Sequence, residues 1–335
     1  MRNSLLDYIC CPHCGKNLTG SDTAVEIEKG VLICEKCSRW FPISNFVPEL
    51  LPDHLRDWDA DLALLDSLES QQTKRLFRKL RRKSKTFQKK AAGVQDSGLA
   101  YKKSEISIKN KVSQPDFFGP GYCSPFNPGN TEYTIQLIRR FGNVLPLLEI
   151  GQGDVVLDVG AGYAWTTEWL KKMGIESIGV DICRTYLDIA LQRMDRDRPH
   201  LIIADVENLP IQTDRLHAVL CFDAFHHIHD RERSMRHFLR ALKKSGRIVL
   251  AEPGEEHEMA EVSQDVMEKY GILEKGMSLS DVEGYCRGLA LEPPEQHFIL
   301  NINNREQAEN LSREFVASHS YLDCNFYVIK KTNDS

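Results

Sequence analysis

Hydrophobic and polar positions follow two alternating spacings between residues 153 and 253. Short apolar runs rich in Val, Ile and Leu occupy 155–158, 176–182, 200–205, 217–223 and 247–253. Between these runs, apolar residues recur every three or four positions, as on one face of a helix. Strands that alternate with amphipathic helices predict a parallel sheet covered by helices.

Two further strands are expected near the end of the chain, at 295–302 and 324–331, after helical patterns beyond residue 255. We therefore expect an α/β fold. Its main part would be a Rossmann-like, doubly wound and mostly parallel sheet of about seven strands.

The first 52 residues have a different pattern, with two cysteine pairs. Cys11-x2-Cys14 is separated by 19 residues from Cys34-x2-Cys37, a spacing that fits one four-thiolate zinc site. Gly15 suits the left-handed residue of a knuckle, and the break at Lys29-Gly30 suggests a hairpin over 24–34. A redox or incidental role for the cysteines is the alternative, and Cys10 is a spare thiol that could replace Cys11.

This N-terminal segment resembles the small zinc-ribbon family that includes the activator subunit of tRNA and protein methyltransferases. The resemblance covers about residues 1–52 and rests on a leucine-rich start, a CPxC motif, a second cysteine pair, an aromatic-Pro-Ile stretch and a Pro-x-Leu-Leu end. It implies a small zinc-ribbon domain that stabilises the chain or binds a protein partner.

Charge is distributed unevenly along the 335 residues. Residues 74–111 hold 14 Lys or Arg and 2 acidic residues, a net +12, which leaves −17 for the rest of a chain with net charge −5. We interpret 53–115 as a basic, partly helical linker between a ribbon at 1–52 and a larger domain at 116–335. The chain has no apolar run of about 20 residues and no signal-peptide pattern, so a cytoplasmic protein without a transmembrane segment is expected.

The first strand of the larger domain leads into a glycine turn. Gly160-Ala161-Gly162 has no third glycine in the dinucleotide pattern, and Asp158 would repel a phosphate but suits a cationic amino group. Asp181 ends the second strand 21 residues after Gly160, where an acid can accept hydrogen bonds from both ribose hydroxyls. S-adenosylmethionine carries an ammonium and a sulfonium but no phosphate, so it fits this combination.

The motifs "VVLDVGAGYAWTTEWL", "GVDI", "ADVENLPI", "CFDAFHHIHD" and "ALKKSGRIVLAEPG" resemble class I S-adenosylmethionine-dependent methyltransferases over about residues 130–255. The subgroup they resemble contains the ubiquinone and menaquinone biosynthesis methyltransferases. The resemblance implies cofactor-binding roles for Asp158, Gly160, Ala161, Gly162, Asp181, Ile182, Asp205, Val206, Phe222 and Asp223. Asp158 would meet the methionine amino group, Asp181 the ribose, Asp205 the adenine, and Phe222 and Asp223 the reactive methyl group.

A base is needed only when the methyl acceptor must lose a proton. His226 and His227 stand at the expected edge of the pocket and are the candidate catalytic residues, although a packing or loop role is the more common explanation for such a pair. Glu252, at the end of the fifth strand, is a candidate for contact with the acceptor.

The acceptor is left open by these patterns. A small molecule or saccharide is favoured, with the zinc ribbon as a built-in structural domain. RNA is the alternative, bound through the ribbon and residues 74–111. A third alternative is a non-catalytic scaffold or partner subunit that keeps the cofactor pocket.

Overall fold

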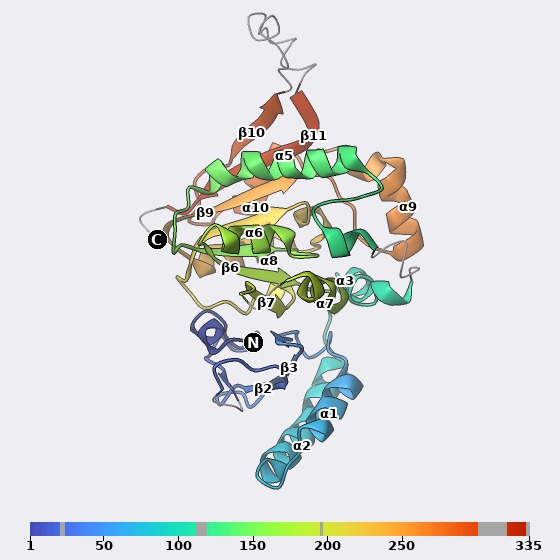
Figure 1. Cartoon of the computed structure of the whole chain (residues 1–335), viewed down its shortest axis with the longest axis vertical. Coiled ribbons are helices and arrows are strands. Elements are labelled where there is room, and N and C mark those ends of the chain that lie inside the picture. The colour runs from blue at the N-terminus through green and yellow to red at the C-terminus, as the bar shows by residue number, and fades with distance from the viewer. Residues whose placement is uncertain (21–23, 112–118, 195–196, 301–319, 333–335) are drawn as a thin grey trace, which may run out of the picture.

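The computed structural model describes residues 1–20, 24–111, 119–194, 197–300 and 320–332. Its main element is a seven-stranded sheet in the order β10-β11-β9-β8-β5-β6-β7 (Figure 1). The strands are β5 (Val155–Val159), β6 (Glu176–Asp181), β7 (His200–Ile203), β8 (Leu216–Phe222), β9 (Leu242–Glu252), β10 (Glu295–Leu300) and β11 (Ser320–Lys330). Neighbouring strands from β7 to β9 are parallel, and only the pairs that involve β11 are antiparallel. The predicted mostly parallel sheet of about seven strands is confirmed; positions 301–302 of the strand expected at 295–302 lie outside the described residues.

Helices cover both faces of this sheet (Figure 1). They are α5 (Thr131–Leu148), α6 (Trp165–Lys172), α7 (Arg184–Arg193), α8 (Arg231–Ala241), α9 (Glu261–Tyr270) and α10 (Leu279–Cys286). On one face, Phe141 of α5 and Trp165 of α6 pack against Val156 and its neighbours. On the other face, Phe238 of α8 packs in the apolar cluster that contains Leu157. Adjacent residues of β5 thus point to opposite layers, as the period of a strand requires.

A second, antiparallel sheet forms the N-terminal ribbon, residues 1–52. It consists of β1 (Thr19–Gly20), β2 (Gly30–Ile33), β3 (Trp40–Ser44) and β4 (Val47–Pro48), paired in that order. The hairpin expected at Lys29-Gly30 is wrong, because β2 begins at Gly30 and residues 24–29 form no strand. The chain reverses between the antiparallel strands β1 and β2, and again between β2 and β3 at the turn that contains Cys34 and Cys37.

The basic segment after the ribbon contains three helices, α1 (Trp58–Ser67), α2 (Lys74–Ala91) and α3 (Leu99–Ile106). Along α2, Phe77, Leu80 and Phe87 are buried, whereas most of the cations are exposed. The indole Nε1 of Trp40 in the ribbon donates a hydrogen bond to Ser84 of α2 at 3.0 Å. Helix α2 therefore packs on the ribbon with its apolar side, and the bounds chosen for the linker stay a prediction.

The ribbon lies against β7, the strand at one edge of the large sheet. The Leu50 N–H donates to the Ile203 carbonyl at 2.7 Å, and the neighbouring Glu49 forms a parallel bridge with Ile203. A second connection joins Ile9 to Ile211 in antiparallel fashion. An unpaired edge strand is an aggregation hazard, and here backbone hydrogen bonds from the ribbon cover part of it.

Candidate active site

The four predicted zinc ligands, Cys11, Cys14, Cys34 and Cys37, form one cluster with every pair of sulfur atoms within 4.8 Å. The Sγ atoms of Cys11 and Cys37 are 3.6 Å apart, and those of Cys14 and Cys34 are 3.4 Å apart. A tetrahedral zinc with bonds of about 2.3 Å places its sulfurs about 3.8 Å apart, so the cluster is consistent with zinc. Cys10 is buried outside this cluster, which leaves Cys11 as the ligand.

Two matching knuckles position these thiols. The N–H of Gly15 donates to the carbonyl of Cys11 at 2.8 Å, and that of Ser38 donates to Cys34 at 2.7 Å. Gly15 and Ser38 both take the left-handed conformation, with φ of 67° and 63°. A glycine marks the first knuckle in the sequence, but nothing comparable marks the second.

The glycine turn after β5 approaches another chain segment closely. Gly160 has φ of 65°, and a Cβ atom added there would lie 2.3 Å from the Cβ of Ala224 after β8. Gly162 is also left-handed, with φ of 52°. A side chain at position 160 would push these two strand ends apart, because the backbone and Ala224 leave no space for it.

Asp181, at the carboxyl end of β6, is held by backbone groups. Its Oδ2 accepts from the Gly162 N–H and its Oδ1 from the Cys183 N–H, each at 2.8 Å. Burial raises the pKa of Asp181 to about 6. The side chain is thus fixed between the glycine turn and the start of α7, and its remaining lone pairs can accept further hydrogen bonds.

Asp158, on β5, is buried more deeply than Asp181. Its Oδ2 accepts hydrogen bonds from the hydroxyls of Thr166, at 2.6 Å, and of Thr167. Burial raises the pKa of Asp158 to about 6. The carboxylate ties β5 to the first turn of α6 and does not line the cavity described next.

A cavity of about 350 Å³ opens at the carboxyl ends of β5 to β8. Of the residues predicted to hold the cofactor, Gly160, Gly162, Asp181, Ile182, Asp205, Val206 and Asp223 line it. Asp158, Ala161 and Phe222 do not. Phe222 packs instead edge-on against Trp165, with ring centroids 5.6 Å apart.

Asp205 takes part in a buried ionic cluster that the sequence did not reveal. The Nζ of Lys102, on α3, contacts Asp205 at 3.1 Å, Asp96 at 3.0 Å and also Glu207. The side chain of Lys102 is only 8% exposed. Burial alone would lower the pKa of Lys102, but the surrounding carboxylates raise it instead, so the lysine carries a charge that offsets theirs.

Asp223 forms the opposite wall and pairs with Arg140 of α5. Two nitrogens of the guanidinium contact its two carboxylate oxygens, each at 3.2 Å. Burial by itself would raise the pKa of Asp223, but Arg140 outweighs burial and lowers it to about 2. Asp223 also has a left-handed backbone, with φ of 58°, which turns its side chain away from the line of β8.

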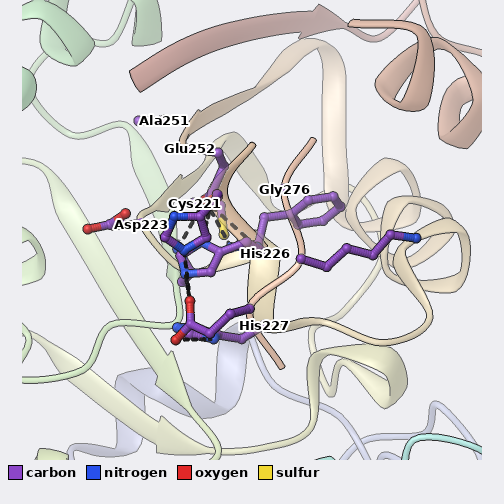
Figure 2. Close-up of polar contacts among 12 residues, drawn as sticks. Cys221, Asp223, His226, His227, Ala251, Glu252 and Gly276 are labelled. Atoms are coloured by element: carbon purple, nitrogen blue, oxygen red, sulfur yellow. Dashed lines mark hydrogen bonds and ion pairs between the residues drawn. The ribbon is translucent and has the colours of Figure 1, made fainter. Parts of the chain in front are cut away.

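The two candidate catalytic histidines have different surroundings (Figure 2). His227 lines the cavity, and its Nδ1 lies 2.6 Å from the carbonyl of Leu273. A carbonyl only accepts, so Nδ1 carries the hydrogen and Nε2 is left with a lone pair. His226 is buried behind the cavity wall, with its Nδ1 2.7 Å from Glu252.

Several lining residues were missed by the sequence reasoning. Tyr101, Lys102 and Glu105 come from α3, and Tyr270 and Glu274 come from α9 and the segment after it. Burial, with Asp181 and Glu274 nearby, raises the pKa of Glu105 to about 8. Its Oε1 is buried and accepts no hydrogen bond from the described residues. No motif marked α3, because its residues lie within the basic segment.

Comparison with known proteins agrees with this architecture. Residues 157–250 match the family model described as a methyltransferase domain, and residues 2–45 match that of a Trm112p-like protein. The expected class I S-adenosylmethionine-dependent methyltransferase domain and N-terminal Trm112-like zinc ribbon are thus confirmed over these two segments, which together are less than half of the chain.

Individual relatives are distant. Methyltransferase GfsG of Streptomyces halstedii is 28% identical over 171 residues, which are 50% of this chain and 59% of that protein. Demethylmenaquinone methyltransferase of Corynebacterium efficiens is 24% identical over 53% of this chain and 72% of its own length. The chain thus spans less than two thirds of the first of these relatives.

Among solved structures, one similar chain comes from a complex of the Haloferax volcanii Trm112 methyltransferase activator with a methyltransferase. It has a TM-score of 0.51 and 20% identity, over 65% of this chain and 98% of that one. At this identity the likeness supports the fold alone.

Proposed function

We propose that this chain transfers the methyl group of S-adenosylmethionine to a small molecule or a saccharide. The observation that carries the proposal is the cavity at the carboxyl ends of the parallel strands, where Asp181 ends β6 and Asp205 follows the neighbouring strand β7, beside the Gly160 turn. Ligands of doubly wound sheets bind at this edge. The demethylmenaquinone relative, named for a small-molecule substrate, supports the same class of acceptor.

The residues of this chain fit that cofactor. The backbone hydrogen bonds on Asp181 fix a carboxylate that would accept the ribose hydroxyls, and Asp205 would accept from the adenine amino group. The cofactor supplies an activated methyl group on its sulfonium. Catalysis by the protein then consists largely of holding the acceptor in line with that methyl group and excluding water.

Enclosure of the cavity favours a small acceptor. Helix α3 contributes Tyr101 and Glu105 on one side, and Val266, Tyr270 and Ile272 come from α9 and the segment after it. A cavity of about 350 Å³ is in the size range of small-ligand sites.

We infer that His227, rather than His226, would accept the proton of a hydroxyl acceptor. His227 lines the cavity with Nε2 available, whereas His226 lies behind the wall. His227→Gln should then lower kcat for a hydroxyl acceptor and leave the cofactor Kd unchanged. A weaker cofactor Kd with unchanged kcat would assign the residue to binding instead.

RNA is a second candidate acceptor, supported by α2. Its apolar side packs on the ribbon, so the exposed Lys and Arg of its outer side are available to phosphates. A scaffold that binds the cofactor without transferring a methyl group is the third candidate.

The deciding experiment is transfer of labelled methyl from S-adenosylmethionine into a fractionated lysate, with and without RNase. Wild type is compared with Asp181→Ala and with Asp188→Ala, which removes a carboxylate on α7 outside the cavity. Label in a low-mass or glycan fraction, lost only in Asp181→Ala, is the expected result. RNase-sensitive label would make RNA the acceptor, and no transfer despite measured cofactor binding would make the protein a scaffold.

We further propose that the ribbon stabilises the methyltransferase domain in cis and that the protein works in the cytoplasm. The cysteines with described side chains are all unpaired, which suits a reducing compartment. Within the described residues, no helix combines the length and apolarity needed to cross a membrane.

A further inference from the structure

Three side chains from distant parts of the chain meet beside the cavity and are not used by the proposed cofactor site. His226 lies in the short helical turn after β8 (Phe225–His227), His257 begins another short turn after β9 (His257–Met259), and Glu274 lies between α9 and α10. One potential ligand atom from each lies within 4.8 Å of the other two. Two imidazoles and one carboxylate are a donor set that binds first-row divalent metals, with Zn²⁺ and Fe²⁺ as frequent occupants.

We propose that His226, His257 and Glu274 form a second metal site, distinct from the four cysteines, for a divalent cation such as Zn²⁺. Because Glu274 lines the cavity, an oxygen atom of the methyl acceptor could bind the metal at a coordination position that the protein leaves open.

The orientation of His226 supports this assignment. Glu252 is fully buried and accepts the backbone N–H groups of Ala224 and Phe225, at 3.1 and 2.9 Å, so it acts as an acceptor. The Nδ1 of His226, 2.7 Å away, therefore donates to Glu252 (Figure 2), and Nε2 is the nitrogen that faces Glu274. A carboxylate that fixes the second nitrogen of an imidazole is the usual outer support of a metal-binding histidine.

Distances within the cluster also fit a metal ion. Nε2 of His226 lies 3.5 Å from Oε2 of Glu274, longer than the 2.7–2.9 Å of a charge-assisted hydrogen bond. Two ligands of one tetrahedral zinc are about 3.4 Å apart, which this spacing matches. Nε2 of His257 lies 2.8 Å from the same oxygen, so metal binding requires that pair to separate by about 0.6 Å.

Arg231 holds the segments that carry two of these ligands. It is buried, and its Nη2 donates to the carbonyl of His226 at 3.0 Å and to that of Lys275 at 2.8 Å. These bonds fix the backbone next to Glu274 relative to His226. The cluster is therefore assembled before any ion arrives, which reduces the conformational cost of binding one.

Glu274 itself lines the cavity, next to His227. A cation there would attract an acceptor oxygen and favour its ionised form, which is the better nucleophile. This role rests on the proposed function, whereas binding of the metal does not.

The test is metal stoichiometry, measured without cofactor or acceptor. Full-length protein is equilibrated with Zn²⁺, or with Co²⁺ as a spectroscopic probe, and bound metal is counted by mass spectrometry. We expect two ions per chain for wild type and one for Glu274→Gln and for His257→Gln. His229→Gln, which removes an exposed histidine of the same segment outside the cluster, should keep two. Circular dichroism and melting temperature establish that each variant is folded.

The spectrum of the Co²⁺ protein separates the two sites. Charge-transfer bands from thiolates report the cysteine cluster, and these should persist in Glu274→Gln, while the weaker bands of a nitrogen and oxygen site disappear. One metal in folded wild type, or two in both Glu274→Gln and His257→Gln, would overturn the proposal.

Activity distinguishes this proposal from the function on which it draws. Methyl transfer by wild-type protein that binds only the metal of the cysteine cluster would contradict the second metal site and support the proposed methyltransferase function. A second metal bound by a protein that transfers no methyl group would support the second metal site and contradict the proposed methyltransferase function.

Discussion

The zinc ribbon and the cavity use their sequence in different ways. The ribbon's ligands come from two knuckles, each within four residues, and each knuckle is closed by its own backbone hydrogen bond. The cavity draws on α3, four strand ends and the segments around α9. The ribbon site can form from local chain geometry and a metal ion, whereas the cavity exists only when the whole sheet is assembled.

The strongest test of this contrast is removal of one zinc ligand. Cys34→Ser should abolish zinc binding at the cysteine cluster and unfold the ribbon, because structural zinc contributes about 10–16 kcal/mol in zinc-finger peptides. Loss of the ribbon also uncovers β7, so the melting temperature of the whole chain should fall. Zinc content and thermal unfolding measure both effects.

Cys10→Ser is the matched control, since Cys10 is buried beside a ligand but lies outside the cluster. We expect Cys10→Ser to bind as much zinc as wild type and Cys34→Ser to bind one zinc ion fewer. A Cys34→Ser protein with wild-type melting would show that the two regions are independent.

The second test concerns Lys102, which connects the linker to the cavity. Lys102→Met leaves Asp96, Asp205 and Glu207 without their shared cation. Breaking a buried ion pair in this way costs about 3–5 kcal/mol, so unfolding by urea should show a loss of that order. Lys103→Met, an exposed neighbour on α3, should change stability little. Equal stability of both variants would mean that α3 is not anchored in the cavity.

A third, smaller effect depends on pH. Because the pKa of folded Asp181 is about 6, its carboxylate is protonated as pH falls through 6. Between pH 7.5 and pH 5, cofactor affinity should therefore fall about tenfold, as one pH unit below the pKa predicts. Titration calorimetry with S-adenosylhomocysteine measures it.

Asp181→Asn is the control. It should bind the cofactor more weakly than wild type, and residue 181 should then add no pH dependence to the affinity. The raised pKa also means that ionised Asp181 destabilises the empty protein above pH 6, and protonation relieves this as pH falls. The stability advantage of Asp181→Asn should accordingly shrink toward acidic pH. If cofactor affinity changes with pH to the same extent in wild type and Asp181→Asn, Asp181 does not bind the cofactor.

The smallest predicted effect lies in the ribbon's contact with α2. Ser84→Ala leaves the buried indole N–H of Trp40 without its acceptor and should cost about 1 kcal/mol. Thr86→Ala, on the exposed side of α2, should be neutral. Denaturant unfolding of both variants compares them, and equal midpoints would contradict packing of α2 on the ribbon.

Sequence patterns predict sites built from neighbouring residues, such as the ribbon's, better than sites assembled from distant segments, such as the cavity. The clustering of Cys11 and Cys34 was predictable because their spacing encodes the site. The position of Asp181 at the cavity was predictable because its strand and the glycine turn are close in sequence, whereas its role in cofactor binding stays a prediction. Lys102, Glu105 and Glu274 were not predictable, because no local pattern tells which face of the sheet a later helix reaches. Ser38 shows a further limit, since it takes the left-handed conformation of its knuckle, closed by the backbone hydrogen bond to Cys34, without being a glycine.

The backbone pairing of Leu50 with Ile203 has a consequence for assembly in the cell. Because both segments belong to one chain, their association is intramolecular and does not depend on the concentration of the protein. Pairing that would be too weak between separate subunits at cellular concentrations is sufficient here. The ratio of ribbon to methyltransferase domain is fixed at one in every molecule that is made, whatever the level of expression.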